Sequence, residues 1–351
     1  MKTPSILGNL LTPVSFALLL VFAVAAGLTG SVTFNNLAAA ETSGSSVRPP
    51  AGAAGGLPVV IQPQPSDSDS WRRIRRGITG TVSIADKKAG LMVQSEGEVW
   101  RNINNGPLKN YGGWLLAAVL IVLVLFFAYR RRIPVEHGLS GETIERFNNL
   151  ERFTHWLTAT CFIILALTGL AVMYGKFVLI PVLGKEGFAA AMAVGKVLHN
   201  YLAFPFMIGV LLTFIIWVKD NIVDRYDLNW VLKAGGLLVK GVHPPARKFN
   251  FGQKAVFWSV FTGGVVLSVT GIVLMFPFAI TDVFGMQDAQ LIHAVIALVL
   301  IAIIIGHIYI GTLGMVGAFD AMGTGMVDKN WAKEHHSVWV EEMEKGGAPG
   351  E

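Results

Sequence analysis

Five long apolar segments constrain the fold of this chain more than any other feature. They cover residues 111–129, 153–174, 197–218, 255–280 and 291–316. An α-helix needs about 20 residues to cross the roughly 30 Å hydrocarbon layer of a bilayer, and each segment has about that length or more. The whole chain is 53% hydrophobic and 15% charged, whereas a soluble domain has about 25% charged residues. The sequence therefore predicts an all-α fold, a transmembrane helical bundle with five membrane spans in the mature chain.

The first 110 residues differ in composition from the rest. Residues 1–40 combine Lys2, an apolar stretch at 14–27 and three alanines before Glu41, which is typical of a cleaved signal peptide. An uncleaved anchor helix is the alternative. Residues 41–110 then form an exported, partly disordered periplasmic segment, rich in Gly, Pro and Ser at first and too short afterwards to build its own core. We expect this segment to dock on a partner.

The remaining residues divide into three parts. Residues 111–132 form an extra transmembrane helix, residues 146–318 a four-helix membrane domain, and residues 319–351 a cytoplasmic tail. The single cysteine, Cys161, excludes an internal disulfide, a multi-cysteine zinc site and a cysteine-ligated iron–sulfur cluster. The sequence contains no C-x-x-C-H motif, which excludes attachment of a c-type haem.

Charge and signal peptide predict the same orientation. A cleaved signal leaves the mature N-terminus in the periplasm, so the first span ends in the cytoplasm, where Arg130, Arg131 and Arg132 follow it. The loop 219–254 would also be cytoplasmic and has seven Lys and Arg residues, whereas the outer loop 281–290 has none and two aspartates. We therefore expect a multi-pass protein of the bacterial inner membrane with a cytoplasmic C-terminus. The net charge of +5 reports orientation and gives no reason to expect a nucleic-acid partner.

Four histidines lie in or beside the predicted spans. His155 is expected near the cytoplasmic face, and His199 and His293 near the outer face. His307 follows His293 by 14 residues in the same span, which is about 21 Å further along an α-helix and within about 40° of the same helix face. The four rings therefore form two layers, with His199 and His293 in the outer layer and His155 and His307 in the inner layer.

Two facing imidazoles in each layer are what a b-type haem needs as axial ligands, so the pattern predicts two haems. One alternative is that each histidine only forms a hydrogen bond to a neighbouring helix. Another is a proton relay, although the last four spans contain no Asp or Glu. Small residues in these spans suit either a flat macrocycle or close helix packing. They are Gly169, Gly263, Gly264 and Gly271.

Several short stretches resemble one known family. They are RFTHW (152–156), KVLHNYLAFPF (196–206), KFNFGQKAVFWSV (248–260), VTGIVLMFP (269–277), the two-histidine span from residue 291, and NWAKEHHSVW (330–339). Together they cover roughly residues 146–342 and resemble the gamma subunit, the cytochrome b subunit, of membrane-bound formate dehydrogenase. The N-terminal signal and extra span are similar to those of a long form of this subunit.

The resemblance implies that the four membrane histidines bind two b haems, and that a quinone is reduced beside the cytoplasmic-side haem. The matching quinone positions are Asn250, Gly252 and Gln253, which are neutral residues suited to a quinone carbonyl at the membrane edge. A helix cap at the start of the fourth of the five spans is the alternative for these residues.

Further implications concern partners and mechanism. The implied partners are a catalytic subunit with molybdenum or tungsten and an iron–sulfur subunit, together with quinone and membrane lipid. Electrons would pass from the periplasmic iron–sulfur partner through two b haems to quinone on the cytoplasmic side during anaerobic respiration. This chain would have no formate-oxidising site of its own. The open alternatives are the cytochrome b subunit of an uptake hydrogenase or of a thiosulfate/polysulfide reductase, and a non-haem membrane anchor.

Overall fold

The computed structural model describes residues 80–81, 91–93 and 96–346. The predicted signal peptide and most of the predicted exported segment lie outside the described residues. Among the described residues, five helical stretches are long and apolar enough to cross a membrane. They are 97–130, 149–178, 180–217, 251–275 and 283–314. The predicted all-α transmembrane bundle is thus confirmed.

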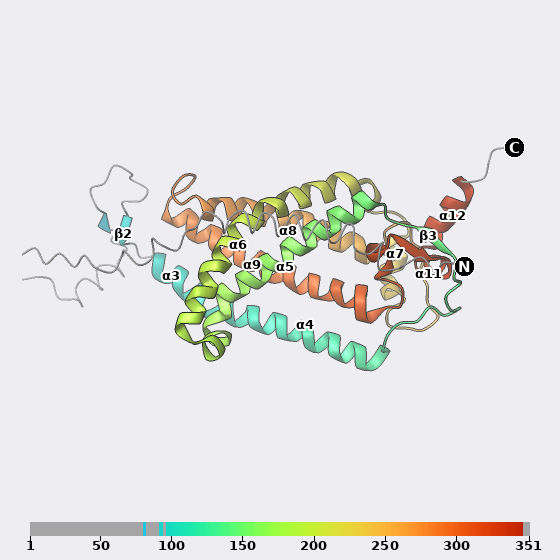
Figure 1. Ribbon diagram of the computed structural model, residues 1–351, viewed down its shortest axis with the longest axis horizontal. Coiled ribbons are helices and arrows are strands. Elements are labelled where there is room, and N and C mark those ends of the chain that lie inside the picture. The colour runs from blue at the N-terminus through green and yellow to red at the C-terminus, as the bar shows by residue number, and fades with distance from the viewer. Residues whose placement is uncertain (1–79, 82–90, 94–95, 347–351) are drawn as a thin grey trace, which may run out of the picture.

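Within the predicted four-helix domain, helices that follow one another in the chain pack side by side. Helix α5 (Asn149–Val178) packs along α6 (Ile180–Trp217), α6 contacts α8 (Phe251–Met275), and α8 packs along α9 (Val283–Tyr309). Helix α4 (Lys109–Arg130) packs on α9 at the edge of the bundle (Figure 1). The backbones of α5 and α9 make few close contacts with each other.

Local sequence explains where three of these helices begin. Asn148 and Asn250 each accept a hydrogen bond from the backbone N–H three residues later, and the side chains of Glu151 and Gln253 each accept one from the backbone N–H of the cap residue. These reciprocal pairs are capping boxes. Asp282 caps α9 by accepting from Gly285 N at 3.1 Å.

Helix α6 begins earlier than the sequence pattern indicated. The apolar segment begins at residue 197, yet α6 starts at Ile180 and continues through the span, with a kink at Gly184, where φ is 70°. The stretch from Lys185 to Lys196 is rich in alanine, a strong helix former, so the polar residues here lie on a helix that extends beyond the apolar segment.

At the other end of the molecule the connecting segments pack together. We call residues 131–148, 219–250 and 315–346 the end cap. The end cap holds β3 (Thr143–Glu145) paired antiparallel with β4 (Met326–Asp328), and the helices η3 (Lys219–Asn221), α7 (Asp227–Leu232), η4 (Ala234–Gly236), α10 (Asp320–Gly323), α11 (Lys329–His335) and α12 (Ser337–Gly346). Phe147, Trp217, Trp331 and Trp339 are buried in one cluster there. The predicted cytoplasmic tail is therefore packed against the bundle over most of its described length.

At the end of the bundle opposite the end cap, a short helix precedes α4. The short helix α3 (Glu96–Ile103) joins α4 through the π-turn η2 (Asn104–Leu108), whereas η5 (Ile310–Gly314) extends the other end of α9 into the end cap. Trp100 Nε1 donates to Gln290 Oε1 at 2.6 Å, which ties α3 to α9. Two short strands, β1 (Gly80–Thr81) and β2 (Leu91–Val93), pair antiparallel beyond this end (Figure 1).

Candidate functional site

Two pairs of histidines face each other inside the bundle. His155 from α5 and His307 from α9 have ring centres 6.2 Å apart with an interplanar angle of 56°. His199 from α6 and His293 from α9 have ring centres 6.3 Å apart with an angle of 57°. These are the two pairs that the sequence predicted to share a layer. Helix α9 supplies one ring to each pair, and α5 and α6 supply the others.

The separation of the rings fits two ligands of one iron. A first-row metal binds an imidazole nitrogen at about 2 Å, and that nitrogen lies about 1.2 Å from its ring centre, so two rings on opposite sides of one metal have centres about 6 Å apart. Both measured distances, 6.2 Å and 6.3 Å, agree with this value. Other metal sites lack support, since no group of three or more His, Cys, Asp or Glu ligands occurs in the part of the chain that the structure describes.

Hydroxyl groups orient both outer-layer histidines. Thr168 Oγ1 lies 2.8 Å from His199 Nδ1 and donates its proton to the carbonyl of Ile164, also at 2.8 Å. With its proton on this carbonyl, or on that of Leu165 at 3.0 Å, the hydroxyl accepts from Nδ1–H and Nε2 of His199 is the unprotonated nitrogen.

Thr270 repeats the arrangement on the second helix pair. Its Oγ1 lies 2.9 Å from His293 Nδ1 and donates to the carbonyl of Val266 at 2.7 Å. The inner layer differs, because the Nδ1 atom of His155 is buried and has no hydrogen-bond partner among the described residues. Sequence reasoning missed both threonines. A Thr-Gly pair occurs at 168–169 and 270–271, but also at 262–263 and 324–325, so this pair alone does not identify them.

The four glycines singled out in the sequence serve two different purposes. A Cβ atom at Gly169 would lie 3.6 Å from His199 Cε1, and one at Gly271 would lie 3.5 Å from His293 Cε1. A Cβ atom at Gly264 would instead lie 2.9 Å from the side chain of Val210, and the nearest atom to one at Gly263 belongs to Leu300. Gly169 and Gly271 thus lie beside the outer histidine rings, where a Cβ atom would make ordinary van der Waals contact, whereas Gly264 allows α6 and α8 to approach closely.

The predicted quinone residues form the start of α8. Asn250 Oδ1 accepts from Gln253 N at 3.0 Å, and Gln253 Oε1 accepts from Asn250 N at 3.1 Å and from Arg146 Nη2 at 3.3 Å. A Cβ atom at Gly252 would lie 2.9 Å from the ring of Trp230, so only glycine fits against that ring without movement. The alternative of a helix cap is confirmed by these bonds, and quinone binding stays a prediction.

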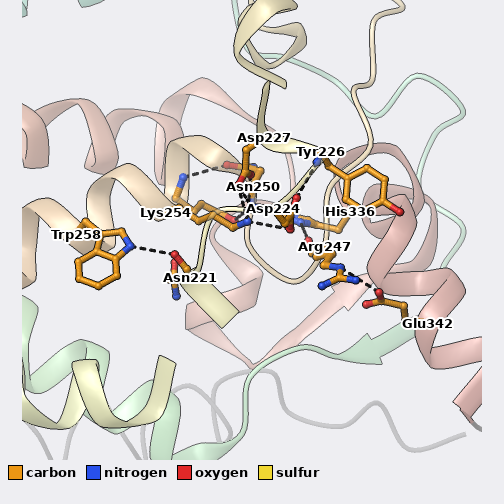
Figure 2. A network of polar contacts seen from close by, with 11 residues as sticks. Asn221, Asp224, Tyr226, Asp227, Arg247, Asn250, Lys254, Trp258, His336 and Glu342 are labelled. Atoms are coloured by element: carbon orange, nitrogen blue, oxygen red, sulfur yellow. Dashed lines mark hydrogen bonds and ion pairs between the residues drawn. The ribbon is translucent and has the colours of Figure 1, made fainter. Parts of the chain in front are cut away.

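A buried ionic cluster lies directly after this cap (Figure 2). Lys254 has a 2% exposed side chain, and its Nζ atom lies 3.0 Å from Asp224 Oδ2 and 2.8 Å from Asp227 Oδ2. Burial raises the pKa of Asp224, but the hydrogen bonds from Lys254 and from the backbone of Tyr226 outweigh it and hold that pKa below its ordinary value. Nearby, Trp258 Nε1 donates to the carbonyl of Asn221 at 2.9 Å. The cluster fastens the segment after α6 to the start of α8.

Comparisons with known proteins agree with this architecture. Residues 146–325, which include α5, α6, α8 and α9, match the family described as prokaryotic cytochrome b561. The chain is 31% identical over 208 residues to the formate dehydrogenase cytochrome b556(fdo) subunit of Escherichia coli K12, covering 58% of this chain and 95% of that protein. It is also 31% identical over 213 residues to the nitrate-inducible formate dehydrogenase cytochrome b556(Fdn) subunit of the same strain, covering 59% and 95%.

A third relative is more distant. The formate dehydrogenase cytochrome b556 subunit of Haemophilus influenzae is 29% identical over 211 residues, which cover 58% of this chain and 85% of that protein. The family match spans just over half of the chain, and the structure has five helices able to cross a membrane. The chain is therefore a multi-pass membrane protein that belongs to the prokaryotic cytochrome b561 family.

Proposed function

We propose that this chain is the cytochrome b subunit of a formate dehydrogenase complex and that it binds two b-type haems. The observation that carries the proposal is the pair of facing histidines in each layer, with ring centres 6.2 Å and 6.3 Å apart. His199 and His293 would bind the iron of one haem, and His155 and His307 the iron of the other. The relatives named as formate dehydrogenase subunits supply the choice of complex.

Bound haems would supply one-electron transfer from an iron–sulfur partner on the periplasmic side to quinone on the cytoplasmic side. The protein's own residues hold the axial nitrogens at a fixed depth, and the apolar helices exclude water around them. In this proposal the N-terminus is periplasmic, the C-terminus is cytoplasmic, and the partners are the molybdenum- or tungsten-containing catalytic subunit and the iron–sulfur subunit. The protein lies in the bacterial inner membrane.

We assign quinone binding to the start of α8. The Asn250 side chain uses its oxygen for the helix cap, so its amide nitrogen is the donor that we assign to a quinone carbonyl. Gln253 is fixed by Arg146, and Gly252 allows the backbone to pass close to Trp230. Protons for the quinone would come from the cytoplasm, on whose side this cap lies in the proposed orientation.

Replacement of one inner-layer ligand tests the haem assignment. His307→Ala should lower the haem content from two per chain to one, measured by haem extraction together with a dithionite-reduced minus oxidised spectrum. The matched control is His137→Ala, because the His137 side chain is 77% exposed in the end cap, and it should retain two haems. A wild-type protein without b-type absorbance would refute haem binding, and a His307→Ala protein that keeps both haems would refute the pairing.

A separate experiment tests which enzyme complex supplies the electrons. Metal analysis of the complex purified through a tag on this chain should find molybdenum or tungsten. Nickel in its place would indicate the uptake hydrogenase alternative. A molybdenum complex that reduces thiosulfate or polysulfide and does not oxidise formate would indicate the other alternative.

A further inference from the structure

We propose that Thr168 and Thr270 are positioning residues that hold His199 and His293 in the ligating tautomer and lower the midpoint potential of the outer-layer haem below that of the inner-layer haem. The inference rests on the proposed function. It adds a physical cause for the proposed direction of electron transfer, namely two hydroxyl groups.

The contacts of the two threonines are alike. Thr168 on α5 contacts a histidine of the following helix α6, and Thr270 on α8 contacts a histidine of the following helix α9. In both cases the next residue is a glycine beside the same ring. A Cβ atom would lie 3.6 Å from the ring at Gly169 and 3.5 Å from the ring at Gly271. The same Thr-Gly unit therefore meets both ligands of one layer.

The donor and acceptor roles are determined by the other bond of each hydroxyl. A threonine hydroxyl has one proton, and in this proposal each proton is assigned to a backbone carbonyl four residues earlier, at 2.8 Å from Thr168 and 2.7 Å from Thr270. Each oxygen can then only accept from the ring, so Nδ1 bears the ring proton and Nε2 is free to bind iron.

A threonine in an apolar helix often bonds to its own backbone, and that bond alone would be structural. The second contact, to a histidine ring at 2.8 Å or 2.9 Å, distinguishes these two threonines from Thr262. Thr262 donates to the carbonyl of Trp258 at 2.7 Å on an exposed face of α8.

The hydrogen bond has a consequence for redox potential. A histidine that donates its Nδ1 proton becomes a more basic ligand through Nε2, and a more basic ligand stabilises the oxidised iron. Both outer-layer histidines donate in this way, whereas the buried Nδ1 atom of His155 in the inner layer has no partner among the described residues. The outer layer therefore has the lower midpoint potential. Electron transfer from the outer to the inner layer is then favourable, which offsets part of the cost of moving an electron inward against the membrane potential.

Isosteric substitution tests the inference in the purified complex. Thr168→Val and Thr270→Val remove the hydroxyls and keep the shape, and Thr262→Val is the matched control. Redox titration of the b-type absorbance gives both midpoint potentials, and the His307→Ala complex, which retains only the outer site, identifies the outer one. We expect each Val variant to raise the outer potential, the double variant to raise it further, and the inner potential to remain unchanged.

Serine variants separate hydrogen bonding from packing. Thr168→Ser and Thr270→Ser retain the hydroxyl and should keep the wild-type outer potential. If a Val variant loses the outer haem and the Ser variant keeps it, the positioning role is supported. Two haems per chain with unchanged potentials in the double Val variant would refute the inference and leave the proposed function intact. A wild-type protein without b-type absorbance would refute the proposed function itself.

Discussion

Replacing Lys254 should loosen the segment between α6 and α8. Lys254→Met keeps the length of the side chain but removes the charge that neutralises Asp224 and Asp227 (Figure 2). Asp227 is 4% exposed, so water cannot replace the lost ammonium group without an opening of the segment. Breaking a buried ion pair by removing one partner costs about 3–5 kcal/mol.

The structure places the cost near the lower end of that range. Asp227 Oδ2 also accepts a hydrogen bond from the backbone N–H of Asp224 at 2.7 Å, so one carboxylate oxygen remains bonded after the substitution. A loss of about 3 kcal/mol in the free energy of local opening corresponds to hydrogen exchange that is faster by about two orders of magnitude.

Hydrogen–deuterium exchange measured by mass spectrometry on the protein in lipid nanodiscs can resolve this change. Exchange should accelerate in residues 221–232 and remain unchanged in the middle of α5. Lys233→Met, an exposed position in the same segment, is the matched control. The double variant Lys254→Met/Asp227→Asn should recover part of the protection, because one of the two uncompensated charges is gone. Exchange of Lys254→Met no faster than that of Lys233→Met would contradict the reasoning.

Two further predictions concern helix packing and pH. Gly209→Ala should destabilise the protein by about 1–3 kcal/mol, because the new Cβ atom would lie 3.2 Å from the backbone Cα of Thr158, whereas Gly311→Ala, with no atom within 4 Å, should not lower the melting temperature. Burial, with a smaller contribution from His243, lowers the pKa of His335 from 6.5 to about 4. The packed end cap therefore favours the neutral ring, whereas the unfolded chain protonates it below pH 6.5. The contribution of His335 to the stability of the end cap is therefore complete above pH 6.5, and the free energy of unfolding falls by about 3 kcal/mol as the pH drops to 4. Thermal melting across this range should show the loss, and His335→Gln should reduce it; a pH-independent wild type would contradict the assignment.

The membrane spans could be predicted because their signal is local. A run of about 20 apolar residues identifies a span without knowledge of any neighbour. The start of α6 at Ile180 and the packing of Trp331 in the end cap could not be predicted in this way. The first depends on helix propensity beyond the apolar run, and the second on contacts between residues nearly 200 positions apart, such as the bond from Glu136 N to Glu334 Oε2 at 3.1 Å.

The candidate site, too, could be predicted from the sequence only in part. The spacing of His293 and His307 places both rings on one face of one helix, and this could be read from the sequence. The contact between Thr168 and His199 depends on how two helices are rotated against each other, and no periodicity within either helix reveals that rotation. The Thr-Gly pair also occurs at 262–263, where no histidine ring among the described residues is contacted, so it does not reveal the contact either.

The shared helix α9 gives the site its geometry. With one ring of each pair on α9, the distance between the two layers depends on the rise of a single helix, about 21 Å over 14 residues, and not on any loop. The partner rings come from α5 and α6, which pack along each other for much of their length and so keep His155 and His199 at matching depths. Long loops elsewhere in the chain can therefore differ among relatives without changing the separation of the layers. In the proposed di-haem arrangement the potential of the outer layer can still be adjusted by one hydroxyl group at a time, because Thr168 and Thr270 lie on the helices themselves.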